Sequence, residues 1–189
     1  GQISNIPGVC VSTLGPGSSN LVNGVANALL DRVPMLAFSG QIDGKREQTF
    51  THQVLDHERM FAPVSKWATR DAPNNVASVM RRALSLSVAE RPGPVHITVA
   101  GDVVGVDAID DEIRLPPMES QGGVAEFYGE FNASLMRNAK RPIIVIGISA
   151  SRAGAGLEIT QFAESQGMPM VVAPMAKGVI DETHPYFAG

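Results

Sequence analysis

Three short apolar runs recur between residues 8 and 101 of this chain, and segments of different character separate them. The runs are "GVCVSTL" (8–14), "PMLAFSG" (34–40) and "VHITVAG" (95–101). The apolar residues are mostly consecutive in the first two runs, and in the third they alternate with His96 and Thr98. We predict that all three runs form buried strands. The sequence therefore predicts an α/β fold: doubly wound parallel sheets with helices on both faces.

Two segments between these runs have the period of an amphipathic helix. Segment 17–31 has apolar residues at helical spacing, and Ser18, Ser19 or Asn20 is expected to cap its start. Segment 74–90 has one apolar stripe, formed by Val76, Val79, Met80, Ala83 and Leu84. Residues 41–56 are predicted to form a long polar loop.

A change of character after residue 101 indicates a second domain. Residues 102–122 are acidic, contain two adjacent prolines and show no period, which is typical of a linker. Helices are then expected at 124–138 and 153–166, and strands at 141–147 and 168–174. The predicted organisation is the C-terminal part of a first domain over 1–104, a linker over 105–122 and the N-terminal part of a second domain over 123–189.

Composition excludes several classes of function. A net charge of −4, a pI near 5.5 and the lack of a basic block argue against nucleic-acid binding. No apolar stretch reaches the about 18 residues of a membrane span. The single cysteine, Cys10, is expected to be a small buried hydrophobe in a reducing, cytoplasmic compartment. Because the sequence opens without Met and closes on "HPYFAG", we expect it to be an internal fragment of a longer protein.

The loop "GPGSSN" (15–20) joins the first predicted strand to the first predicted helix. Gly15 and Gly17 allow the backbone to approach a ligand closely, and Pro16 stiffens the turn. The amide of Asn20 offers a donor and an acceptor, which suits the edge of a heterocycle. A tight turn without a ligand is an equal alternative, and the loop matches neither the P-loop nor the dinucleotide-binding pattern.

The long loop contains the stretch "TFTHQVLDHERMF" (49–61), with four polar side chains in six positions. Its two histidines are not at a spacing suited to zinc. Asp56 and His57 are expected to lie in a solvated loop. His52 and Gln53 are the functional candidates, because a loop of this length in a compact domain usually serves function.

A second turn of small residues occurs in "VIGISASRAGAG" (145–156). It is a candidate phosphate or nucleotide cradle. A surface turn is the favoured alternative, because Ile148 and Ser149 follow Gly147 in place of a second glycine. Arg152 is either a phosphate ligand or an ordinary surface residue.

Taken in order, these segments resemble the thiamine diphosphate enzymes of the acetolactate synthase type. The stretch "PGVCVSTLGPGSSNLVNGVANALLDRVPMLAFSGQ" is similar to their pyrimidine-binding domain. The family's order and spacing continue in "THQVLDHERMFAPVSKW", "RPGPVHITVAGDV", "RPIIVIG" and "AKGVIDETHPYFAG". The resemblance spans essentially the whole chain and favours a ligand for the loop 15–20.

The resemblance implies roles for individual residues. The positions that border the aminopyrimidine ring would be Gly15, Pro16, Gly17 and Asn20. Gln53 matches a glutamine that points toward cofactor and substrate, with His52 beside it as a second catalytic candidate. Lys66 and Trp67 match a stretch near the substrate channel. In the central domain, the positions facing FAD, or an ADP or CoA moiety, would be Gly147, Ser149, Met175 and Gly178.

Parts of the family's site have no counterpart in this sequence. The glutamate that activates the pyrimidine ring precedes the "PGV" segment, and a C-terminal domain holds Mg²⁺ and the diphosphate. The family's active site forms between subunits, so the resemblance implies a homo-oligomer and an isolated fragment without activity. The family's glycine-rich turn in the central domain is reduced here to Gly147-Ile148-Ser149, which departs from the family's pattern for FAD binding.

The activity that the resemblance implies is decarboxylation of a 2-oxo acid, such as pyruvate, followed by carbon–carbon bond formation, as in branched-chain amino acid biosynthesis. Alternatives with the same cofactor are a 2-oxo acid decarboxylase, an oxalyl-CoA-type lyase and a sulfoacetaldehyde acetyltransferase. A stand-alone, non-catalytic binding module is the alternative from another class.

Overall fold

The computed structural model describes residues 3–4, 6–107 and 129–189, which form two compact units. The first unit lies within Gly1–Ser120 and the second within Gln121–Gly189. Most of the expected linker, residues 108–122, and the first residues of the expected helix 124–138 lie outside the described residues. Each unit is described by itself.

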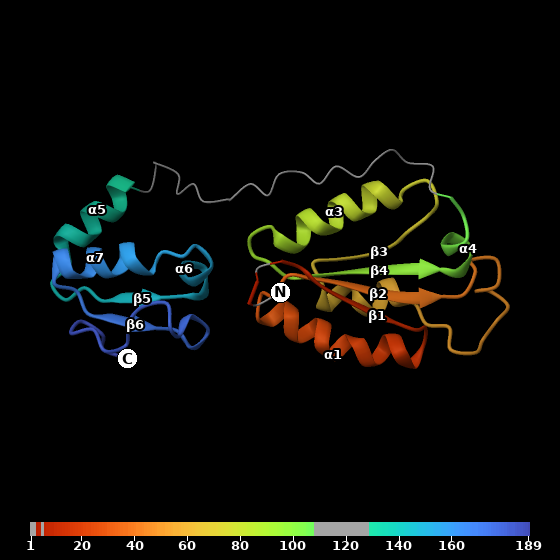
Figure 1. Ribbon diagram of the computed structural model, residues 1–189, viewed down its shortest axis with the longest axis horizontal. Coiled ribbons are helices and arrows are strands. Elements are labelled where there is room, and N and C mark those ends of the chain that lie inside the picture. The colour runs from red at the N-terminus through yellow and green to blue at the C-terminus, as the bar shows by residue number, and fades with distance from the viewer. Residues whose placement is uncertain (1–2, 5, 108–128) are drawn as a thin grey trace. The chain divides into compact units, whose positions relative to one another are not determined.

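The first unit is built on a four-stranded parallel sheet (Figure 1). Its strands, in spatial order, are β1 (Gly8–Ser12), β2 (Met35–Gln41), β4 (Pro94–Ala100) and β3 (Trp67–Arg70). Helix α1 (Pro16–Leu30) covers one face and helix α3 (Val76–Val88) covers the other. This arrangement confirms the predicted α/β class, although β3 was not expected from the sequence.

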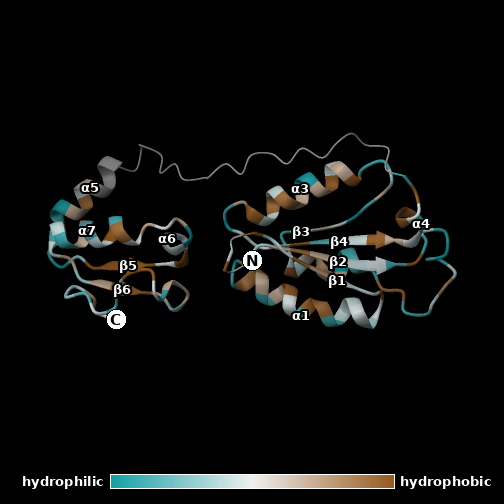
Figure 2. Ribbon diagram, viewed as in Figure 1, coloured by the Kyte–Doolittle hydropathy of each residue, from teal (hydrophilic) through white to brown (hydrophobic). Residues whose placement is uncertain are grey.

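Two hydrophobic clusters, one on each face of the sheet, hold these layers together. Leu36 of β2 packs against Val79 and Ala83 of α3, whereas its neighbour Ala37 packs against Val25 of α1. Successive strand residues point to opposite faces, so the apolar run of β2 supplies both clusters. The expected burial of β1 on both faces is wrong, because Val9 and Val11 are exposed. Figure 2 shows the mixture of apolar and polar residues along α1 and α3 that suits helices with one buried side.

The start of α1 differs from the predicted one. Gly15 is the N-cap residue and Pro16 the first helical residue, and no side chain caps the helix. Proline is well suited to this position because it has no N–H group that needs an acceptor. The expected cap by Ser18, Ser19 or Asn20 is therefore wrong. Ser18 is fully buried and its hydroxyl donates to Ser39 Oγ at 2.9 Å.

Short elements complete the first unit: α2 (His57–Phe61), whose Phe61 packs with Val25 of α1 and Ala37 of β2, and α4 (Gly101–Val104), at the carboxyl end of β4. Helix α2 runs into a 3₁₀ turn at Ala62–Val64, and α4 follows β4 directly. The loop 42–56 connects β2 to α2. Cys10 of β1 is half-buried among apolar side chains, as expected, and burial raises the pKa of its thiol.

The second unit contains a two-stranded parallel sheet of β5 (Ile144–Ile146) and β6 (Met170–Val172). Its helices are α5 (Gly129–Asn138), α6 (Ile148–Arg152) and α7 (Gly156–Gln166), and a 3₁₀ turn, η3, spans Pro174–Ala176. The core contains Ile146, Ala163, Met170, Ala176 and Ile180. Both strands are shorter than predicted. Among the described residues, no helix combines the length and apolar content needed to cross a membrane.

Candidate functional site

The turn after β1 and the loop 42–56 meet at Gly15 and Gln53. Gly15 is buried and has φ +59°, a conformation that disfavours residues with a Cβ atom. A Cβ atom at this position would lie 2.7 Å from both the Cβ atom and the carbonyl oxygen of Gln53. Only glycine fits here, so the structure brings together two residues that the sequence singled out independently.

The side chains around this contact face solvent. Gln53 is exposed and has φ +61°, which is uncommon for a residue other than glycine. His52 is exposed, and its ring meets the edge of the Phe50 ring at a centroid distance of 6.5 Å. Asn20 is exposed on the first turns of α1. These groups are therefore accessible to a ligand at the carboxyl edge of the sheet, where open α/β sheets bind ligands.

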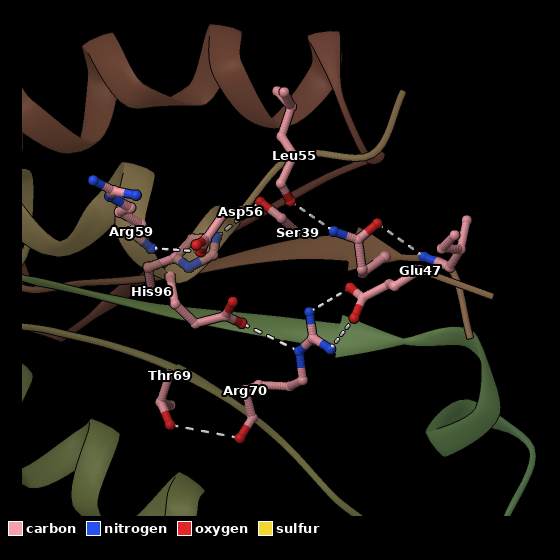
Figure 3. Close-up of polar contacts among 11 residues, drawn as sticks. Ser39, Glu47, Leu55, Asp56, Arg59, Thr69, Arg70 and His96 are labelled. Atoms are coloured by element: carbon pink, nitrogen blue, oxygen red, sulfur yellow. Dashed lines mark hydrogen bonds and ion pairs between the residues drawn. The ribbon is translucent and has the colours of Figure 1, made fainter. Parts of the chain in front are cut away.

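Gln41, the last residue of β2, closes the loop 42–56 at its base. Its side chain is buried; Nε2 donates to the Leu55 carbonyl oxygen at 2.9 Å, and Oε1 accepts from the Ile42 N–H at 3.1 Å. The contact to Leu55 appears in Figure 3. One amide group thus ties both ends of the loop to the sheet.

Arg70, the last residue of β3, binds two carboxylates on either side of Gln53 in the sequence. Its Nη1 and Nη2 atoms donate to Glu47 at 2.7 and 2.6 Å, and Nε donates to Glu58 at 3.3 Å (Figure 3). The hydrogen bond to Glu47 raises the pKa of Arg70 above its ordinary value, so the guanidinium stays charged. We call Arg70, Glu47 and Glu58 the ion triad.

The expectation of a solvated loop holds for Asp56, which is exposed at the end of the loop 42–56, and is wrong for His57. Asp56 is the N-cap of α2, and its Oδ1 accepts from the Arg59 N–H at 2.9 Å. His57 begins the helix and is fully buried, so burial lowers its pKa. The short helix was hard to detect from sequence because its five residues are too few to show a period.

A buried polar cluster lies beneath the site at Ser39. The Ser39 hydroxyl is 2.9 Å from His96 Nε2, 2.9 Å from Ser18 Oγ and 3.1 Å from Ser12 Oγ. The Phe61 ring stacks on the His96 ring with a centroid distance of 3.7 Å. Burial, followed by the effect of nearby His57, lowers the pKa of His96 to about 3, so His96 is neutral near pH 7.

An apolar hollow of about 500 Å³ lies beside the carboxyl ends of three strands. Its lining residues are Val9, Val11, Ser12, Phe38, Gly40, Gln41, Val99, Gly101 and Val104. Gln41 is shared between this hollow and the base of the loop 42–56. Apolar surroundings strengthen polar contacts made at their border, because the local dielectric constant is lower than that of water.

Lys66 and Trp67 lie at the opposite edge of the sheet. The Lys66 N–H donates to the Pro94 carbonyl oxygen at the amino end of β4, and Nζ donates to the Ala89 carbonyl oxygen at 2.8 Å. Trp67 packs against the α3 face, with the Arg82 guanidinium 4.5 Å from its ring centroid. The structure does not bring these two residues to Gly15 and Gln53, so their proximity to a substrate channel stays a prediction.

The four candidate residues of the second unit gather at one edge of its sheet. Gly147 caps α6 directly after β5, and Ser149 lies in that helix. Met175 lies in η3 after β6, and Gly178 follows with φ +83°. Because β5 and β6 are parallel, both turns lie at the carboxyl ends of their strands, where nucleotide sites of α/β proteins form.

Three residues of the first site were missed in the sequence. Gln41, Glu47 and Arg70 act across the fold, and in these hydrogen bonds their partners lie 12 to 23 positions away along the chain. The available signal was modest: Gln41 is a polar residue placed directly after the apolar run 34–40, at the edge where ligands bind.

The fold and the candidate site define an α/β protein whose candidate ligand-binding loops lie at the carboxyl edges of parallel sheets. Two family models match the chain. One, described as "Thiamine pyrophosphate enzyme, N-terminal TPP binding domain", matches residues 1–60. The other, "Thiamine pyrophosphate enzyme, central domain", matches residues 130–189. The chain belongs to the thiamine pyrophosphate enzyme family.

Its relatives include several enzymes that are about three times as long. The acetolactate synthase large subunit of Corynebacterium glutamicum is 32% identical over 192 residues, which is 100% of this chain and 31% of the relative. 2-Hydroxyacyl-CoA lyase 1 of Homo sapiens is 28% identical, over 100% of this chain and 33% of the relative. Oxalyl-CoA decarboxylase of Escherichia coli K12 is 28% identical, over 100% of this chain and 35% of the relative. The chain thus spans about a third of the length of these relatives.

Proposed function

We propose that this chain forms the pyrimidine-side wall of a thiamine diphosphate site in an enzyme that resembles acetolactate synthase. The observation that carries the proposal is the contact between Gly15 and Gln53, where a Cβ atom would lie 2.7 Å from the neighbouring backbone. The match of residues 1–60 to a thiamine-binding domain and the acetolactate synthase relatives support it.

The residues at this edge fit a flat heterocycle. The turn Gly15–Pro16–Gly17 offers backbone without bulky side chains, and the exposed Asn20 amide can both donate and accept a hydrogen bond. The hollow lined by β1, β2 and β4 has an apolar lining that suits the faces of a ring. When bound, thiamine diphosphate supplies a carbon nucleophile and an electron sink for breaking the bond beside a 2-oxo acid carbonyl.

Gln53 is the proposed catalytic residue of this chain, with His52 beside it. Its exposed amide can donate to the substrate carbonyl oxygen as negative charge develops there. Such a contact accelerates the reaction only if it strengthens in the transition state. The proposed substrate is a 2-oxo acid, with pyruvate first, and the proposed product contains a new carbon–carbon bond.

The second unit is proposed to bind a nucleotide, either FAD or an ADP or CoA moiety. Its four candidate positions converge at one sheet edge, and residues 130–189 match the central domain of the family. Mg²⁺, bound outside this chain, and a homo-oligomer whose active site lies between subunits are further parts of the proposal. A cytoplasmic location, which the single Cys10 favours, completes it.

A second candidate function uses a CoA thioester as substrate. The lyase of Homo sapiens and the decarboxylase of Escherichia coli, both matched over the whole chain, favour it. Assays of the intact protein with pyruvate, a 2-hydroxyacyl-CoA and oxalyl-CoA, each with thiamine diphosphate and Mg²⁺, separate the two. We expect acetolactate from pyruvate; turnover of a CoA thioester alone would replace the first function with the second.

Replacement of Gln53 tests the catalytic role directly. In the intact protein that contains this chain, we expect Gln53→Ala to lower kcat about tenfold or more, because one donor to a developing negative charge is lost. Gln48→Ala is the matched control, since Gln48 is an exposed glutamine of the same loop. Steady-state kinetics of both variants give the answer, and an unchanged kcat in Gln53→Ala would remove Gln53 from the mechanism.

A further inference from the structure

Residues 48–56, which include the candidates His52 and Gln53, are held mainly by contacts at the two ends of the segment. Among the described residues, the side chains of residues 51–54 make no hydrogen bond or ion pair. Gln53 nevertheless has a left-handed backbone conformation and lies against Gly15. A solvent-exposed loop keeps such a conformation only when the surrounding structure imposes it. The contacts that impose it must therefore lie at the ends of the segment.

The ion triad holds the segment at both ends. Glu47 precedes residues 48–56 and Glu58 follows them, and both carboxylates bind the guanidinium of Arg70. Arg70 itself ends β3, whose pairing with β4 fixes its backbone: Arg70 is in register with Thr98. One side chain on a rigid strand therefore binds both flanks of the segment, in addition to the Gln41 amide, which binds the Leu55 carbonyl oxygen.

The geometry of Arg70 suits this role better than that of a lysine would. Two of its nitrogen atoms meet the two oxygen atoms of Glu47 at 2.7 and 2.6 Å, which is a bidentate pair, while the third reaches Glu58. A planar guanidinium fixes direction as well as distance, whereas an ammonium group is a point charge. The three side chains are 23% to 32% exposed, so the triad lies at the border of the site.

We propose that Arg70 is a positioning residue, which acts through Glu47 and Glu58 to hold residues 48–56 so that Gln53 rests against Gly15. Arg70 touches no reacting group in this account. The consequence for catalysis rests on the proposed function of Gln53; the consequence for the loop does not.

Hydrogen exchange of the intact protein measures the loop directly. With Arg70→Met, we expect backbone amides of residues 48–54 to exchange at least tenfold faster, while amides of β2 and β4 keep their rates. In Arg70→Lys, the exchange rates of these amides should lie between those of the wild type and of Arg70→Met, because lysine keeps the positive charge but cannot form the bidentate pair. Arg82→Met is the matched control: it removes an arginine that lies over Trp67, away from the loop.

Faster amide exchange in β2 would reveal that Arg70→Met unfolds the protein. In that case, milder variants keep the test decisive. Glu47→Gln removes one charge from a partly exposed side chain and should also speed exchange in 48–54. In the double variant Glu47→Gln/Arg70→Lys, the logarithm of the exchange rate should rise by less than the sum of the two single rises, because the two side chains act as a unit. Unchanged exchange in 48–54 for Glu47→Gln and for a folded Arg70 variant would overturn the proposal.

Binding of thiamine diphosphate and turnover separate this inference from the proposed function. Faster loop exchange together with lower kcat and an unchanged melting temperature supports both. Faster loop exchange with unchanged kcat supports the positioning role and contradicts the catalytic role of Gln53. If kcat of Arg70→Lys is closer to the wild-type value than kcat of Arg70→Met is, this would further support positioning by a charged side chain of similar length.

Discussion

The contact between Gly15 and Gln53 concentrates two backbone requirements in one place. Both residues have positive φ, and the missing Cβ atom of Gly15 lets the two segments touch. The sequence predicted each residue separately, Gly15 from the strand-to-helix turn and Gln53 from the long loop and the resemblance. It could not predict the contact, which depends on how far the loop 42–56 folds back over β1.

Replacement of Gly15 by alanine is expected to destabilise the first unit. The left-handed backbone alone costs roughly 1–2 kcal/mol for a residue with a Cβ atom, and the clash with Gln53 adds to it. Gly24→Ala is the matched control, because a Cβ atom at Gly24, inside α1, meets no atom within 4 Å. Thermal unfolding of the intact protein should show a lower melting temperature for Gly15→Ala and an equal or higher one for Gly24→Ala. Equal melting temperatures for Gly15→Ala and the wild type would contradict both the backbone cost and the cost of the clash with Gln53.

At the scale of elements, the sequence predicted those whose side-chain pattern repeats. Helices α1 and α3 show apolar residues three or four apart, β2 begins with four consecutive apolar residues, and β4 alternates Val95, Ile97 and Val99 with polar residues. Strand β3 is only "WATR", a mixed stretch whose extension comes from pairing with β4. Helix α2 has five residues and depends on its Asp56 cap. These two unpredicted elements carry Arg70 and Glu58, so the ion triad was also missed.

The packing of α2 on β4 makes stability depend on pH. His96 of β4 lies among Ser39, Phe61 and His57, and its folded pKa is lowered to about 3, below the ordinary value of 6.5. The unfolded chain therefore binds protons that the folded chain does not as pH falls through 6.5. The stabilising effect of the neutral histidine is complete above pH 6.5 and is lost progressively toward pH 3, by about 1.4 kcal/mol per pH unit at most.

Chemical denaturation between pH 7 and pH 4.5 measures this slope. We expect the free energy of unfolding to fall less steeply in His96→Gln than in the wild type, because glutamine does not titrate. The comparison uses slopes, so a uniform loss of stability from the substitution leaves it intact. Parallel slopes would mean that His96 binds its proton equally well in the folded and unfolded states.

At the scale of the whole molecule, each unit places its cofactor candidates at the carboxyl edge of its own parallel sheet, whereas Lys66 and Trp67 lie at the amino edge of the first sheet. The first unit matches the thiamine-binding domain of the family and the second its central domain. Periodicity and composition predicted both α/β units, whereas their chemistry came from the resemblance. The relatives are about three times as long as this chain, so the chain supplies part of the wall of the proposed site.

Titration of thiamine diphosphate with Mg²⁺ into the intact protein that contains this chain tests the central claim most directly. Calorimetry should show saturable binding to the wild type and to Gly24→Ala, and at least tenfold weaker binding to Gly15→Ala, because the added methyl group displaces Gln53 or the turn. Equal affinity in Gly15→Ala and the wild type, or no binding to the wild type, would contradict the assignment of the Gly15–Gln53 contact as the wall of a thiamine diphosphate site.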